Sequence, residues 1–230
     1  AGNTVLGESA LDASVSGGNN TAVGKEALTT LTSGTRNTSI GGTTLQNLTT
    51  GDLNTCVGYT AGQDLTTGTG NTCIGSQSGK DLTTSSNNTA IGRNTLITAT
   101  DSSTDNTAVG YQTLMLCTSG DSNTAVGSHA LDSNTTASNN TAVGYDSLGV
   151  NTTGTQNTAV GALALDANTT GGANVAIGES ALTANTTATN NTSIGRHSMV
   201  SNTTGTQNVA VGTNALDANT TANNNTAVGY

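Results

Sequence analysis

The sequence predicts an all-β protein, a β-solenoid (a β-roll or β-helix) of fourteen coils. The pentapeptide Asn-Thr-Ala-Val-Gly or a close variant recurs fourteen times, at a spacing of 17 residues except for one step of 18, between Gly92 and Gly110. A fixed period indicates a repeat architecture. This period is too short for a helical hairpin, and the Thr-Ala-Val run favours a short strand. The recurring glycines are Gly7, Gly24, Gly41, Gly58, Gly75, Gly92, Gly110, Gly127, Gly144, Gly161, Gly178, Gly195, Gly212 and Gly229.

The composition favours a thin core inside each coil. The 230 residues include no Phe, Trp or Pro, but 30 Gly. Aromatic side chains usually dominate burial in a thick core, so their scarcity argues against one. Only 8% of the residues are charged, with five Lys and Arg and a formal net charge of −9. This balance argues against a nucleic acid or an anionic membrane surface as a partner.

The chain is expected to form a single repeat array over residues 1–230, with a one-residue insertion near 99–105. No apolar run approaches the length of a membrane span, and no signal peptide is visible, so membrane insertion is not expected. Solenoids carry atypical capping repeats at their ends. Neither end of this array differs in that way, so we expect it to be a segment of a longer chain.

Each coil is numbered from its Asn, so that the recurring Gly is position five. Position three is always small, position four is Val, Ile or Leu, and position nine is usually Leu. Gly and Asn favour the left-handed backbone of tight turns. We therefore expect one strand per coil around positions two to four, with coils stacked about 4.8 Å apart.

The charged residues indicate which positions are buried. All 19 of them (5 basic and 14 acidic) lie at positions six, seven, ten, eleven, fourteen, sixteen and seventeen. Columns that never hold a charge are expected to be buried or tightly stacked. Strand side chains alternate, so a Val at position four that points into the coil would leave position three outside. Positions three and eight would then be two small, neutral stripes that pack against other chains, which predicts a homotrimeric fibre.

These assignments define a predicted core and a predicted ladder. The core consists of Val at position four and Leu at position nine: Val23, Val57, Val109, Val126, Val143, Val160, Leu131, Leu165, Leu182 and Leu216. Stacked Asn side chains can form amide ladders, and position one predicts one that includes Asn20, Asn37, Asn54, Asn123, Asn140 and Asn157. Position twelve, which is Leu in early coils and Asn in later ones, is predicted to point inward too.

No catalytic, cofactor or metal site is expected. His129 and His197 share position seven but lie four coils apart, roughly 19 Å at the strand spacing, too far to share a metal ion. Cys56 and Cys73 occupy position three of neighbouring coils, which permits either a disulfide or two small buried thiols. The sequence contains no CxxC motif, Cys/His cluster or Ser/His/Asp arrangement. We therefore do not expect an enzyme.

Two surface columns offer alternatives. Tyr59, Tyr111, Tyr145 and Tyr230 occupy position six, a varied and exposed column, and are candidates for contact with a glycan or another surface. Positions thirteen and fourteen carry nearly continuous Thr or Ser, as the Thr ladders of ice-binding solenoids do. Adjacent strand positions face opposite ways, so only one of these columns can be outward. The Asn-Thr-Thr triplets match the glycosylation sequon, but they begin at the inward position twelve.

The repeat unit, as at 157–171 and 208–221, resembles the repeats of bacteriophage tail fibres and related bacterial surface proteins that end in an intramolecular chaperone. It is similar, more loosely, to the head repeats of YadA-like trimeric autotransporter adhesins. The resemblance implies a homotrimeric fibre on a virion, outside the cell or on a bacterial surface. The array would be its structural shaft, and a recognition tip beyond this segment would bind a host-surface glycan or protein. The alternatives are an ice-binding solenoid and a self-stacking extracellular filament subunit.

Overall fold

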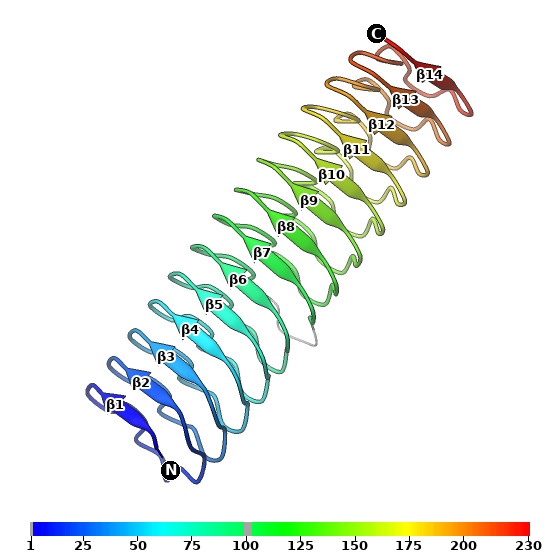
Figure 1. The fold of residues 1–230 in the computed structure, drawn as a ribbon. Coiled ribbons are helices and arrows are strands. Elements are labelled where there is room, and N and C mark those ends of the chain that lie inside the picture. The colour runs from blue at the N-terminus through cyan, green and yellow to red at the C-terminus, as the bar shows by residue number, and fades with distance from the viewer. Residues whose placement is uncertain (1, 99–102) are drawn as a thin grey trace. The chain divides into compact units, whose positions relative to one another are not determined.

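In a computed structural model of the protein, which describes residues 2–98 and 103–230, the chain forms a β-solenoid (Figure 1). The described residues form fourteen parallel strands and no helix, and each strand covers positions two to four of one coil. This confirms the predicted all-β solenoid with one coil per repeat. The predicted insertion near 99–105 falls mainly on residues outside the described part. Within that part, no helix is long and apolar enough to cross a membrane.

The chain divides into two compact units, an N-terminal unit (1–119) and a C-terminal unit (120–230). Within each unit the strands lie side by side in chain order. The N-terminal unit contains β1 (Thr4–Leu6), β2 (Thr21–Val23), β3 (Thr38–Ile40), β4 (Thr55–Val57), β5 (Thr72–Ile74), β6 (Thr89–Ile91) and β7 (Thr107–Val109). The C-terminal unit contains β8 (Thr124–Val126), β9 (Thr141–Val143), β10 (Thr158–Val160), β11 (Val175–Ile177), β12 (Thr192–Ile194), β13 (Val209–Val211) and β14 (Thr226–Val228).

Strands within a unit pair in register, so each residue lies beside its equivalent in the next coil. Ala142 of β9, for example, pairs with Ala159 of β10. Backbone hydrogen bonds continue beyond the strand, since the Gly144 N–H donates to the Val126 carbonyl at 2.8 Å. A side chain introduced at one position therefore contacts the equivalent residues of the neighbouring coils first.

The turns depend on unusual backbone conformations. Positions seven and nine and the last residue of the coil are left-handed in every complete coil, for example at Asp146, Leu148 and Gln156 with φ of 48°, 52° and 61°. A left-handed Leu is sterically unfavourable by about 1–2 kcal/mol, and full burial of the Leu148 side chain offsets that cost. Position five needs Gly for a second reason. At Gly144, where φ is 139°, an added Cβ would lie 2.5 Å from the carbonyl oxygen of Gly161.

The strand faces are the reverse of the prediction. Position three is buried in most coils, and Ala142 and Ala159 are completely inaccessible. Position four lies on the outside, with Val143 36% and Ile177 38% exposed. The prediction of a Val core is therefore wrong for the position-four residues, which are only half-buried or exposed: Val23, Val57, Val109, Val126, Val143 and Val160. The small residues of position eight are also mostly buried, so neither small stripe forms a surface for other chains.

The narrow interior explains this reversal. The Leu of position nine enters it opposite the strand, and Leu131, Leu165 and Leu182 are fully buried, while Leu216 is half-buried. Positions three and nine face each other. At Gly62, a position-nine residue, an added Cβ would lie 2.8 Å from the sulfur of Cys56. Opposite each fully buried Leu the position-three residue is Ala or Ser, while Cys56 and Cys73 lie opposite Gly62 and Gly79. The β-branched Val and Ile take the outward position that suits a pleated surface.

Two buried columns of Asn stack the coils. At position one, Asn157 donates its backbone N–H to Oδ1 of Asn140 at 2.9 Å and its side-chain amide to the Gly171 carbonyl at 2.9 Å. The predicted ladder is thus present within each unit, and its named members are all buried: Asn20, Asn37, Asn54, Asn123, Asn140 and Asn157. At position twelve, Asn168 donates to Oδ1 of Asn151 at 2.8 Å. These ladders satisfy amides that would otherwise be costly to bury.

Candidate functional site

The most distinctive surface in each unit is the outer strand face, formed by positions two and four of its strands. Position two is Thr except at Val175 and Val209, and position four is Val, Ile or Leu. Neither position holds a charged residue. Several side chains of position four are more than a third exposed: Leu6, Ile40, Ile74, Ile91, Val143, Ile177, Ile194 and Val228. An exposed apolar strip of this kind indicates an interaction surface.

The Thr hydroxyls of the outer strand face are not used by the fold. Among the described residues, the Thr side chains of position two make no hydrogen bond to the protein. Position thirteen differs, because the Thr152 hydroxyl donates to the Thr169 carbonyl at 2.9 Å and the Thr169 hydroxyl donates to the Thr186 carbonyl at 3.1 Å. The hydroxyls that remain available for a ligand or a partner therefore include those of position two and most of those of the exposed position fourteen.

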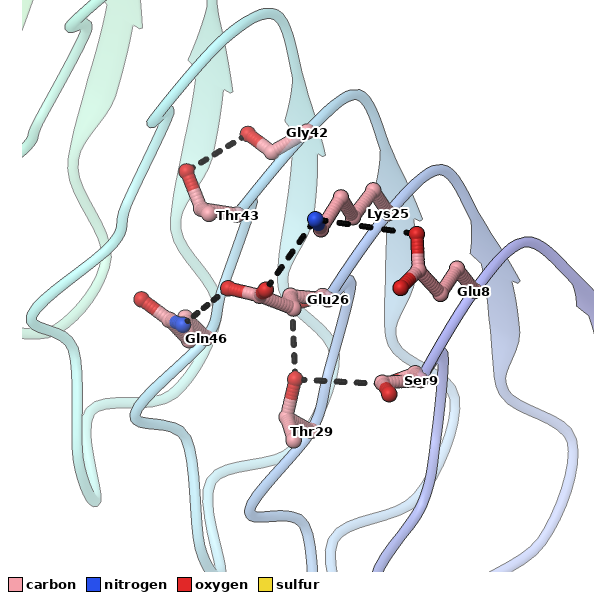
Figure 2. Close-up of polar contacts among 8 residues, drawn as sticks. All are labelled: Glu8, Ser9, Lys25, Glu26, Thr29, Gly42, Thr43 and Gln46. Carbon is pink, nitrogen blue, oxygen red and sulfur yellow. Dashed lines mark hydrogen bonds and ion pairs between the residues drawn. The ribbon is translucent and has the colours of Figure 1, made fainter.

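A polar edge follows the strands, at positions six, seven and ten. Figure 2 shows it in the first three coils, where Lys25 Nζ lies 3.6 Å from Glu8 and 3.9 Å from Glu26. The Gln46 amide donates to Glu26 at 3.0 Å, and the Thr29 hydroxyl donates to the Glu26 carbonyl at 2.8 Å. Exposed ion pairs contribute little to stability. This polar edge can therefore stay hydrated next to the uncharged outer strand face.

The same edge is more crowded in the C-terminal unit. His129 Nδ1 lies 3.5 Å from Asp132 Oδ2, and the Tyr145 ring meets the His129 ring edge-on at 6.4 Å. Burial raises the pKa of Asp132, and burial together with the Asp146 charge raises the pKa of Asp166. Within the part of the chain that the structure describes, no three His, Cys, Asp or Glu side chains are placed to hold a metal ion.

The residues singled out from the sequence stay apart. Tyr59, Tyr111, Tyr145 and Tyr230 are all exposed and belong to four separate coils. The two histidines likewise belong to different coils. At positions twelve to fourteen, Asn134 and Asn168 are fully buried, so those sequons are shielded from solvent in the folded chain.

The sequence does indicate the outer strand face, but the larger size of the position-four residues points to that position as the core. Positions two and four are both uncharged and mostly β-branched, as expected for neighbours on one side of a strand.

Comparison with known proteins finds no matching family model, no similar curated protein and no similar solved structure. A function for this chain is therefore proposed from the properties of its outer strand face.

Proposed function

We propose that this protein is the structural shaft of an extracellular or virion attachment fibre, a tail fibre or adhesin. Three chains would associate through their outer strand faces, and a recognition tip would engage a host-surface glycan or protein. The observation that carries the proposal is the uncharged, partly apolar outer strand face of each unit. The repeat resemblance supplies the fibre context and the number of chains.

The outer strand face suits contact between identical chains. Covering the exposed part of each Val or Ile contributes roughly 1 kcal/mol, and the column recurs in every coil. No charge has to be desolvated, which removes the main cost of burying a polar surface. Three such faces around a common axis also form a closed symmetric assembly, as most homo-oligomers do.

The rest of the perimeter fits an exposed shaft. The four tyrosines and the charged side chains other than Asp101 occupy positions six, seven, ten, eleven, sixteen and seventeen, which would face water in such an assembly. Stability would come from stacked coils and amide ladders along each chain. On this proposal the protein is not an enzyme and binds neither nucleic acid nor a membrane interior. Its role is to hold a binding module away from a virion or cell surface.

The test is the mass in solution of the 22.5 kDa chain and of two double variants, by sedimentation equilibrium. The unmodified chain should have three times the monomer mass. Val143→Asp with Val160→Asp, on the outer strand face, should lower the mass to that of one chain while circular dichroism still reports the strands. The matched control is Thr153→Asp with Thr170→Asp at the exposed position fourteen, and it should stay trimeric. A monomeric unmodified chain, or equal effects of both pairs, would contradict the proposal.

Ice binding is a second candidate, and the unused Thr hydroxyls of the outer strand face favour it. In each unit, Thr and Val or Ile form two regular columns that repeat about every 4.8 Å. This moves the candidate ice surface from positions thirteen and fourteen to positions two and four. Ice binding requires the face to be uncovered, so it predicts a monomer with thermal hysteresis that Thr141→Lys lowers. A trimer without thermal hysteresis would exclude it.

A further inference from the structure

The two cysteines of the N-terminal unit lie side by side in its interior. Cys56 of β4 and Cys73 of β5 are in-register partners at position three. Both are fully buried and both are free thiols. Burial, followed by the neighbouring Cys73, raises the pKa of Cys56, which favours the neutral thiol at that position.

The two coils that contain these cysteines also differ from the other coils at position nine. Position nine is Leu or Met in the other complete coils, but it is Gly62 and Gly79 in these two. A Cβ added to Gly62 would lie 2.8 Å from Cys56 Sγ, and one added to Gly79 would lie 2.5 Å from Cys73 Sγ. The two sulfurs therefore occupy the space that two leucines fill elsewhere. Leu45 and Leu82 complete an apolar wall beside the glycines.

The parallel register disfavours a disulfide and favours a linear bridge. A disulfide needs a torsion near 90° about the S–S bond and Cβ atoms about 3.8 Å apart. In-register parallel strands instead place equivalent Cα–Cβ bonds parallel and about 4.8 Å apart. Two metal–sulfur bonds of about 2.3 Å each, placed end to end, span about 4.6 Å. With the two sulfurs one coil spacing apart, a two-coordinate ion would fit between them without moving a strand.

We propose that Cys56 and Cys73 form a buried, two-coordinate site for a soft divalent metal ion, for which Hg(II) is the probe. Thiolates select soft ions. Each thiol would release one proton and form one metal–sulfur bond, with no change of oxidation state, so one divalent ion replaces two protons. The resulting dithiolate complex is neutral, which suits a core where an unpaired charge is costly. A monovalent ion would leave one negative charge there, and Zn(II) requires four ligands.

The test is titration of the reduced chain with Hg(II), with Cys117→Ala as the background so that only the pair can react. Thiolate-to-mercury absorption in the ultraviolet should saturate at one ion per chain, with release of two protons and a rise in the unfolding temperature. Cys56→Ala and Cys73→Ala should each weaken binding by at least about a hundredfold. Both variants should fold, since Ala is the commonest residue at position three. Two ions per chain, undiminished affinity in either variant, or binding only in denaturant would overturn the proposal.

Discussion

Ala142 and Val143 are consecutive residues of β9, yet their side chains lie on opposite sides of the coil. Ala142 is inaccessible and its space is limited by the Leu column of position nine, whereas Val143 is 36% exposed on the outer strand face. The smaller residue is thus the core residue. The outward position of Val143 also leaves an apolar column free for contact with another chain.

This arrangement predicts opposite results for the same enlargement at neighbouring positions. Ala142→Leu should lower the free energy of unfolding by roughly 1–3 kcal/mol or more, because it overpacks a full interior. Val143→Leu should cost less, because its side chain lies on the outer strand face and not in the full interior. Urea unfolding of both variants at one protein concentration measures the difference. A larger loss for Val143→Leu would contradict the assignment of the two faces.

The sequence alone was enough to predict the period, the position of the strand in each coil and the position-one ladder, because each of these depends on repetition. Asn140 recurs in every coil, and in-register stacking converts such a column into an amide ladder. It was not sufficient for the direction of the strand side chains. The larger residue is usually the buried one, but Leu148 fills this narrow interior from the other side. The small columns of positions three and eight, which were predicted to contact other chains, consequently lie mostly inside the coil.

The glycine columns allow a test of backbone conformation against steric contact. Gly144 and Gly154 both leave too little room for a Cβ, which would lie 2.5 Å and 2.3 Å from a neighbouring carbonyl oxygen. Only Gly144 also has a φ of 139°. Gly144→Ala should therefore cost at least about 2 kcal/mol. Gly154→Ala should cost less than about 1 kcal/mol, because position fifteen already holds Ala137 in the preceding coil and Ala188 two coils further on. Thermal unfolding of the two variants tests this, and equal losses would show that the contact alone decides.

The position-one amide ladder predicts that truncation of one Asn side chain has a large effect on the free energy of unfolding. Asn140→Ala removes the acceptor of the buried Asn157 N–H at 2.9 Å and the donor to the Gly154 carbonyl at 2.9 Å. The Gly154 carbonyl keeps the Asn151 amide as a donor at 2.9 Å, so one buried group, the Asn157 backbone N–H, is left without a partner and one further hydrogen bond is lost. Together these losses should lower the free energy of unfolding by roughly 2–4 kcal/mol. Thr153→Ala is the control, because that side chain is exposed at position fourteen. Hydrogen exchange should also show faster exchange of the Asn157 amide in Asn140→Ala. An unchanged rate would show that the ladder is not needed to protect this amide.

The position-ten carboxylates predict how stability depends on pH. The pKa of Asp166 is raised, first by burial and then by the charge of Asp146. A raised carboxyl pKa in the folded chain means that the folded state favours the protonated form. Its contribution is therefore fully present below the unfolded pKa of about 3.9, and it is lost as pH rises through the higher folded pKa.

Replacing this carboxyl by its neutral isostere should remove that loss. Asp166→Asn should be more stable than the unmodified chain at pH 7, and the difference should shrink towards zero as pH falls below about 3.9. Asp217→Asn is the matched control, since Asp217 occupies the same position but is exposed. Urea unfolding between pH 3 and pH 7 measures both variants. If Asp166→Asn were less stable at pH 7, its carboxylate would have to be stabilised in the fold, and the burial argument for this edge of the coil would be wrong.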